Sequence, residues 1–159
     1  MYLIKKKKDK NNTVDDLWSF KDELIYWRKA NQIHKFFCDK GEEIEEQIAY
    51  KLKKEDLKEL LDICNKILKE VITEPGKIRN GARYSLEKQE WEPILENGKV
   101  IVNTEICEEL LPTQSGCFFG STDYDEYYLE KIEYTKEQLE QVIDEIDNDT
   151  EDIYYLASW

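Results

Sequence analysis

The sequence has few of the residue types that bind metals. Its 159 residues contain one histidine and four cysteines, and the cysteines form no C-x-x-C pair or other zinc spacing. It also lacks a phosphate-binding glycine loop and a dinucleotide fingerprint. We therefore expect no bound metal and no cofactor, and we expect reduced, buried thiols.

The sequence also has no long apolar run. None approaches the roughly 20 residues that a membrane-spanning helix needs, and the apolar start at residues 2–4 is too short for a signal peptide. With 40% hydrophobic and 12% aromatic residues, the chain nevertheless has enough apolar side chains to fold. We expect a single domain over residues 1–159 that contacts no membrane and is cytoplasmic.

Positive charge is scarce in the C-terminal third. The net charge is −13, and residues 104–159 carry two Lys/Arg against sixteen Asp/Glu. Such a segment repels nucleic acid, so direct DNA or RNA binding is not expected. The excess is either a solvated surface or a mimic of a phosphate backbone. The candidates for this acidic surface are Asp123, Asp125, Glu126, Glu130 and Glu133.

A helix is expected from about Asp22 to Asp39, ending before Gly41. Helical spacing places a tryptophan, an amide, an imidazole and a thiol on one stripe: Trp27, Asn31, His34 and Cys38. Buried amide and imidazole groups need hydrogen bonds. They either satisfy scaffold carbonyls or point at a ligand, and the pattern leaves both open.

The clearest helix covers about Lys54 to Thr73, where leucines and isoleucines repeat on one face. Residues 48–52 before it form a short strand or extend that helix. Residues 74–102 look like an inserted β-hairpin with two-residue turn signals at Asn80-Gly81 and Asn97-Gly98, and Pro93 limits that strand to a sheet edge. A short helix from Thr104 to Leu111 follows.

The stretch from Leu110 to Tyr128 predicts loop, strand, turn and helix in that order. The strand is Cys117 to Phe119, and the helix begins at Ser121-Thr122-Asp123. A capping box at Thr135 and Gln138 allows this long helix to restart, and residues 153–159 read as a final strand.

Together these elements predict an α+β fold. A small, mainly antiparallel sheet holds the N-terminal strand, the 117–119 strand and the C-terminal strand. Three or four helices pack against it, because each has one apolar stripe that needs cover. The hairpin at 74–102 is an insertion in this domain.

Two long segments give the chain a resemblance to a known family. They are YWRKANQIH at residues 26–34 and LLPTQSGCFFGSTDYDEYY at residues 110–128, and the start MYL and the aromatic C-terminus add to the likeness. The chain resembles small uncharacterised proteins of bacteriophages and prophages of Gram-positive bacteria. Members often have phenylalanine where Cys117 stands. The resemblance implies a phage accessory protein in an infected bacterial cell.

The same two segments suggest a pocket that binds a small anionic or nucleotide-like ligand. Its members would be Trp27 as a stacking face, Arg28 for an anion, and polar groups from Asn31, His34, Thr113, Gln114, Ser115 and Gly116. A phage could use such a pocket to sequester a nucleotide from a host defence pathway. Non-catalytic binding is favoured because no serine-elbow context surrounds Ser115.

Two alternatives remain open from the sequence. The first is an acidic inhibitor that imitates nucleic acid and binds a host defence protein. The second is a small hydrolase in which His34 activates Ser115 or Cys117. The sequence also leaves open a homo-oligomer.

Overall fold

The structure is a computed structural model that describes residues 1–8, 22–40, 49–116 and 120–157. One antiparallel sheet has the strand order β2-β1-β6-β3, formed by Glu23–Tyr26, Tyr2–Lys7, Glu151–Leu156 and Ala49–Leu52. A second sheet consists of β4 (Thr73–Ser85) and β5 (Glu90–Ile101). The described helices are α2 (Asn31–Lys40), α3 (Lys54–Glu70), α4 (Glu105–Leu110) and α5 (Glu126–Val142). This arrangement confirms the predicted α+β fold, including the N- and C-terminal strands in one sheet.

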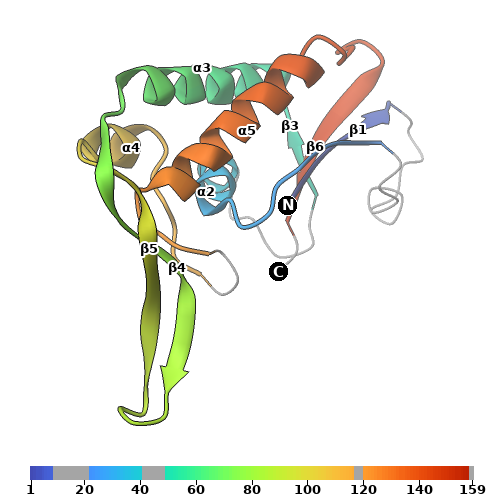
Figure 1. The fold of residues 1–159 in the computed structure, drawn as a ribbon. Coiled ribbons are helices and arrows are strands. Elements are labelled where there is room, and N and C mark those ends of the chain that lie inside the picture. Colours follow the sequence, from blue (N-terminus) through green and yellow to red (C-terminus); the bar gives the residue numbers. More distant parts are fainter. Residues whose placement is uncertain (9–21, 41–48, 117–119, 158–159) are drawn as a thin grey trace.

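The four-stranded sheet packs one face against the helices. Leu3 of β1 lies opposite Ile25 of β2 and Tyr155 of β6, and all three side chains are buried in the main core. Successive residues of a strand point to opposite faces, so Ile4 and Leu156 form a separate small cluster on the other face. The sheet lies at one end of the molecule, with the helices beside it (Figure 1).

Helices α3 and α5 pack against each other and supply much of the core. Their buried residues recur every three or four positions, as the leucine and isoleucine spacing predicts: Leu57, Leu60, Cys64 and Ile67 in α3, and Tyr128, Ile132, Leu139 and Val142 in α5. No helix in the described part of the chain is long and apolar enough to cross a membrane.

The predicted helix from Asp22 to Asp39 is wrong in its first half. Residues 23–26 form strand β2, and the helix begins only at Asn31. Ile25 is buried against the core, and pairing with β1 satisfies the backbone groups of this segment. Between β2 and α2, Lys29 adopts a φ of 56°, which is incompatible with a continuous helix.

The hairpin exists, but it does not turn at either Asn-Gly pair. Asn97 and Gly98 lie inside β5, and Asn80 and Gly81 form a bulge in β4 between Arg79 and Ala82. The chain reverses at residues 86–89 instead. Gly98 is required for packing, because a Cβ there would lie 2.8 Å from Glu126 Oε1. Gly81 supplies the positive φ, 95°, that the bulge adopts.

The long C-terminal helix also starts later than predicted. Asp125 is its N-cap: its carboxylate accepts hydrogen bonds from the backbone N–H groups of Tyr127 and Tyr128. The helix runs without a break past Thr135, so the predicted restart is wrong. Of the two alternatives for residues 48–52 the strand is present, as Ala49–Leu52, and the final strand predicted at 153–159 is present as Glu151–Leu156. The predicted strand at 117–119 and the last two residues lie outside the described part of the chain.

One buried hydrogen bond links the sheet end to α5. The indole Nε1 of Trp27 donates to Thr135 Oγ1 at 3.0 Å, and that hydroxyl donates to the Lys131 carbonyl at 2.7 Å. Both residues are at most 2% exposed. Thr135 therefore serves as the partner of a buried indole, which explains a hydroxyl in the middle of the helix.

We predict that Thr135→Val lowers the free energy of unfolding by about 1–3 kcal/mol, because the buried indole N–H of Trp27 loses its acceptor. Thr135→Ser is the matched control, since it keeps the hydroxyl and loses only a methyl group. Urea denaturation of the three proteins measures the difference. Equal stability of the valine variant and the parent protein would contradict the assigned role.

Candidate functional site

Three segments that are distant in sequence meet at the start of α2. Asn31 is the first residue of this helix, and its side chain is 1% exposed. Its Nδ2 donates to the Ser121 carbonyl at 2.8 Å, and its Oδ1 accepts from the Gln114 backbone N–H at 3.1 Å. One amide thus ties residues 113–114 and 120–121 to the connection between β2 and α2.

Gly120 and Lys29 lie unusually close together where two of these segments touch. Gly120 has a φ of 84°, and a Cβ at this position would lie 3.3 Å from Lys29 Cβ. Lys29 itself has a φ of 56°, a region that non-glycine residues seldom occupy. Such conformations are held in place by surrounding contacts, and they cluster at functional sites.

Beside this junction lies a cavity of about 500 Å³, which we call the basic cavity. Four cationic residues line it: Arg28, Lys29, Arg79 and Lys131. The remaining wall comes from Asn80, Gly81, Ala82, Gly120, Ser121 and Tyr127. None of the four cations forms an ion pair with a residue that the structure describes. The volume lies in the usual range for small-molecule sites.

The cationic residues of the basic cavity come from three parts of the fold. Arg28 and Lys29 lie between β2 and α2, Arg79 borders the bulge of β4, and Lys131 is on α5. Burial lowers the pKa of Lys131, and the nearby Lys29 also lowers it. The carboxylates of Asp125 and Glu130 oppose this shift. The Lys131 ammonium donates to the Tyr127 carbonyl at 2.9 Å, which leaves it two further donors.

Tyr127 contributes a neutral ring to the wall of the basic cavity. Its hydroxyl donates to Glu96 of β5. This hydrogen bond and the negative charge of Glu96 raise the pKa of Tyr127 to about 12, so the phenol keeps its proton at neutral pH. The same bond lowers the pKa of Glu96 and keeps its carboxylate ionised. Glu96 is therefore a fixed negative charge beside this wall, and Asp125 and Glu130 lie close enough to Lys131 to act on its pKa.

A second cavity of about 300 Å³ adjoins the first and shares Arg28 and Lys131 with it. We call it the aromatic recess, because Tyr26 and Tyr134 line it and remain 42% and 40% exposed. The Tyr134 hydroxyl donates to the Tyr26 carbonyl at 3.0 Å. The rest of the wall comes from Trp27, Ala30 and Glu130. Two tyrosines therefore flank the cationic pair on the side away from the β4 bulge.

The structure places two of the predicted site residues in the core. Trp27 is 2% exposed, and its ring packs near Phe37 and Tyr155. It belongs to the lining of the aromatic recess but offers almost no exposed surface for stacking on a ligand. His34 contacts the Tyr155 hydroxyl through Nδ1 at 2.8 Å and Cys38 Sγ through Nε2 at 3.2 Å. Burial lowers the pKa of His34 to about 4, so its ring is neutral at pH 7.

The predicted residues 113–116 brace the junction. The Thr113 backbone N–H donates to the Tyr124 hydroxyl at 3.2 Å, and its own hydroxyl donates to the Thr122 carbonyl at 3.0 Å. Gln114 meets Asn31 through its backbone, while Ser115 and Gly116 are exposed. The segment that sequence reasoning proposed as ligand-binding thus contacts the 121–124 segment and α2.

The predicted acidic surface is correct in part. Asp123, Glu130 and Glu133 are exposed and Glu126 is half-buried. Asp125 does not belong to this surface, because it is 2% exposed and caps α5; burial raises the pKa of its carboxyl group. Within the described residues, no three His, Cys, Asp or Glu side chains gather closely enough to hold a metal ion.

Sequence reasoning included Arg28 but missed the other cationic residues of the cavity. Lys131 carried a usable signal, since it is one of only two cations among residues 104–159. Arg79 carried none, because nothing in its local sequence indicates that the bulge of β4 lies beside α5. The set is visible only when the three parts of the fold are assembled.

We predict that Asn31→Ala lowers the free energy of unfolding by about 1–3 kcal/mol, since the Gln114 N–H and the Ser121 carbonyl both lose a partner. Asn31→Asp keeps the acceptor for Gln114 but loses the donor and places a carboxyl group against the Ser121 carbonyl, so it serves as a partial control for the Gln114 contact alone. Amide hydrogen exchange should quicken at Gln114 in the alanine variant and much less in the aspartate variant. Unchanged exchange in both would contradict the bridging role.

Known proteins supply no guide to this site. Comparison of the chain with protein-family models, curated proteins and solved structures gave no match. The likeness to phage proteins stays a prediction. The geometry and charge of the basic cavity are therefore the features that point to a function.

Proposed function

We propose that the basic cavity binds a small anionic ligand of nucleotide size. The observation that carries this proposal is the gathering of Arg28, Lys29, Arg79 and Lys131 around one cavity in a protein of net charge −13. Abundant carboxylates elsewhere could have paired with these cations. An anion that enters the cavity meets four positive charges, of which two are guanidinium groups suited to bidentate binding of phosphate or carboxylate.

The energetics favour an anion over an empty cavity. Four like charges around one space repel one another. Burial and Lys29 lower the pKa of Lys131, whereas Asp125 and Glu130 oppose this shift. A bound anion would relieve the repulsion among the cations. Lys131 is half-buried, whereas the other three cations are exposed. The attraction to an anion is therefore strongest beside Lys131, where an effective dielectric constant below that of water increases the interaction between charges.

The aromatic recess extends the proposal from a bare anion to a nucleotide-like ligand. Tyr26 and Tyr134 can pack against a planar ring, while the shared Arg28 and Lys131 face the anionic end. A nucleotide combines these two features. We therefore propose that Tyr26 and Tyr134, rather than Trp27, stack on the ligand.

The biological role we propose is sequestration of such a ligand by a phage accessory protein, in line with the family resemblance. We propose binding without turnover, because the cavity wall consists of cations, a protonated tyrosine and small residues. A sequestering protein needs affinity, and the cationic set supplies it. The substrate class of this proposal is a nucleotide that carries at least one phosphate.

We predict that Arg28→Ala weakens the binding of ADP or inorganic pyrophosphate by about 1.5–3 kcal/mol, about 10- to 150-fold in Kd, because it removes a charged hydrogen-bond donor. Isothermal titration calorimetry measures the change. Lys77→Ala is the matched control: it removes one positive charge from an exposed residue outside the lining of the cavity. This control variant should bind as the parent protein does.

The same experiment separates the proposal from an acidic inhibitor. If Arg28→Ala keeps full biological activity while charge reversals at Asp123, Glu130 and Glu133 abolish it, the acidic surface carries the function. Salt gives a second criterion, because mimicry of nucleic acid should weaken much more steeply with ionic strength than binding in a partly enclosed cavity.

We predict that ligand binding weakens at alkaline pH before an ordinary lysine, with a pKa of about 10.4, would lose its proton. The reason is the lowered pKa of Lys131: as pH rises through this value, the cavity loses one positive charge. Lys131→Arg should retain binding at that pH, since arginine stays protonated, and Lys131→Met should weaken binding at all pH values. Identical pH profiles for the parent protein and the arginine variant would contradict the role of Lys131.

A further inference from the structure

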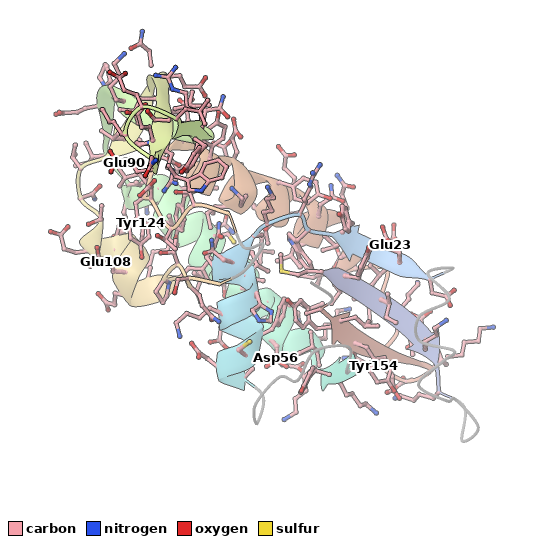
Figure 2. The ribbon with its side chains drawn as sticks, turned by 90° about the horizontal axis from the view of Figure 1, so that it is seen from below. Glu23, Asp56, Glu90, Glu108, Tyr124 and Tyr154 are labelled. Carbon is pink, nitrogen blue, oxygen red and sulfur yellow. The ribbon has the colours of Figure 1, made fainter. Side chains whose placement is uncertain are left out.

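The β4–β5 hairpin projects from the body as an arm (residues 74–102). In Figure 1 it extends away from the helices, and in Figure 2 Glu90, at its far part, lies at the opposite end of the molecule from Tyr154 of the sheet. The base of the arm is anchored: Ile78 is 2% exposed, and the Lys99 backbone N–H donates to Glu126 of α5 at 2.9 Å. The outer half has no such cover among the described residues.

The outer half of the arm has one charged face and one uncharged face. Residues directly opposite in an antiparallel pair share a face. On one face Arg83 lies opposite Glu92, with an ion pair at 3.5 Å. The other face carries no charged side chain on the strands from Ala82 outward, where it consists of Ala82, Tyr84, Trp91 and Pro93. Leu95 continues this face toward the body, on the near side of the bulge, where it lies opposite Arg79.

This uncharged face, which we call the apolar face, is exposed. Trp91 is 69% exposed, Leu95 55% and Tyr84 46%. The Tyr84 and Trp91 rings pack edge to face across the strands, with centroids 5.6 Å apart. A two-stranded hairpin is marginally stable alone, so an amphipathic ribbon of this length gains stability when its apolar face is covered.

We infer that the apolar face is covered by the same face of a second copy of this chain. Charge supports a second copy meeting at the arm. Residues 74–102 carry five Lys/Arg and five Asp/Glu, so the arm is neutral and the body holds the whole net charge of −13. Two bodies repel each other. An arm-to-arm contact brings the two neutral parts together and keeps the acidic bodies apart.

The shape of the apolar face suits a twofold dimer. Large side chains, Tyr84 and Trp91, alternate along it with the smaller Ala82 and Pro93. In an isologous contact each copy offers the same surface, so the aromatic pair of one copy can sit over the smaller pair of the other. An aromatic side chain covers about 150–250 Å², so the contact is well below the ~800 Å² per partner of a standard interface. The dimer is therefore weak and dependent on concentration.

Sedimentation equilibrium of the intact chain from about 5 to 500 µM tests the inference, with the micromolar range chosen for an interface of this size. The apparent mass should rise from 19.1 kDa toward twice that value. Higher salt should strengthen the dimer, because it screens the repulsion between the acidic bodies. Trp91→Ser and Leu95→Ser should each raise the dissociation constant at least tenfold. Ile94→Ser is the matched control, since Ile94 neighbours Leu95 but belongs to the opposite face.

Three results would overturn the inference. The first is a chain that stays monomeric at 500 µM in high salt. The second is loss of the dimer in Ile94→Ser to the same degree as in Trp91→Ser. The third is a dimer that dissociates on adding salt, which would point to contacts between charges. Circular dichroism confirms that each variant is folded, and none of these substitutions touches the lining of the basic cavity.

Discussion

The side-chain amide of Asn31 is the contact on which the candidate site depends. It donates to Ser121 and accepts from Gln114, and so it fixes two segments about 80 and 90 residues further along the chain against the start of α2. An amide is suited to this task because it offers a donor and an acceptor on one rigid group. A buried amide group without hydrogen-bond partners costs free energy, so these two hydrogen bonds fix the positions of the three segments relative to one another. The position of Gly120 beside Lys29 follows from this arrangement.

The local charge of the site differs from that of the whole protein. Most carboxylates of the C-terminal third are exposed to water, where they repel one another weakly. Three of the four cations of the basic cavity are exposed as well, and only Lys131 is half-buried, but all four line one cavity. A bound anion would offset the repulsion among them. Exposed ion pairs contribute little to stability, so the fold loses little by leaving these cations without one among the described residues, and we propose that their grouping serves ligand binding.

Strand β4 connects the two proposals physically. Arg79 and the bulge at its middle line the basic cavity, and Tyr84 near its end belongs to the apolar face. The bulge changes the direction of the strand at the point where the arm leaves the body. The base of the arm is thereby part of the ligand site, while its outer half is free to contact another molecule. Ala82 belongs to both surfaces, but the cations of the cavity and the aromatic pair of the arm are different residues, so substitutions can test the two proposals separately.

The sequence by itself determined the elements whose signals are local and repeated. The leucine spacing of α3, the fold class and the two terminal strands followed from periodicity and composition. The conformation of the Asn-Gly pairs and the first residue of α2 did not follow from the sequence, because pairing with a partner strand outweighs local turn and helix preferences. Pairing with β1 makes residues 23–26 a strand, and the longer ladder of the arm keeps Asn97 and Gly98 inside β5.

Only the tertiary structure decided which side chains surround the cavity. Arg28 was predicted, yet its neighbours Arg79 and Lys131 come from a different strand and a different helix, and no spacing in the sequence brings them together. Trp27 was predicted as a stacking face, but it is buried, and its indole N–H donates to Thr135 Oγ1. Local patterns depend on neighbours within a few residues, whereas a binding cavity depends on contacts between segments 50 to 100 residues apart, and those contacts exist only after packing has selected one arrangement.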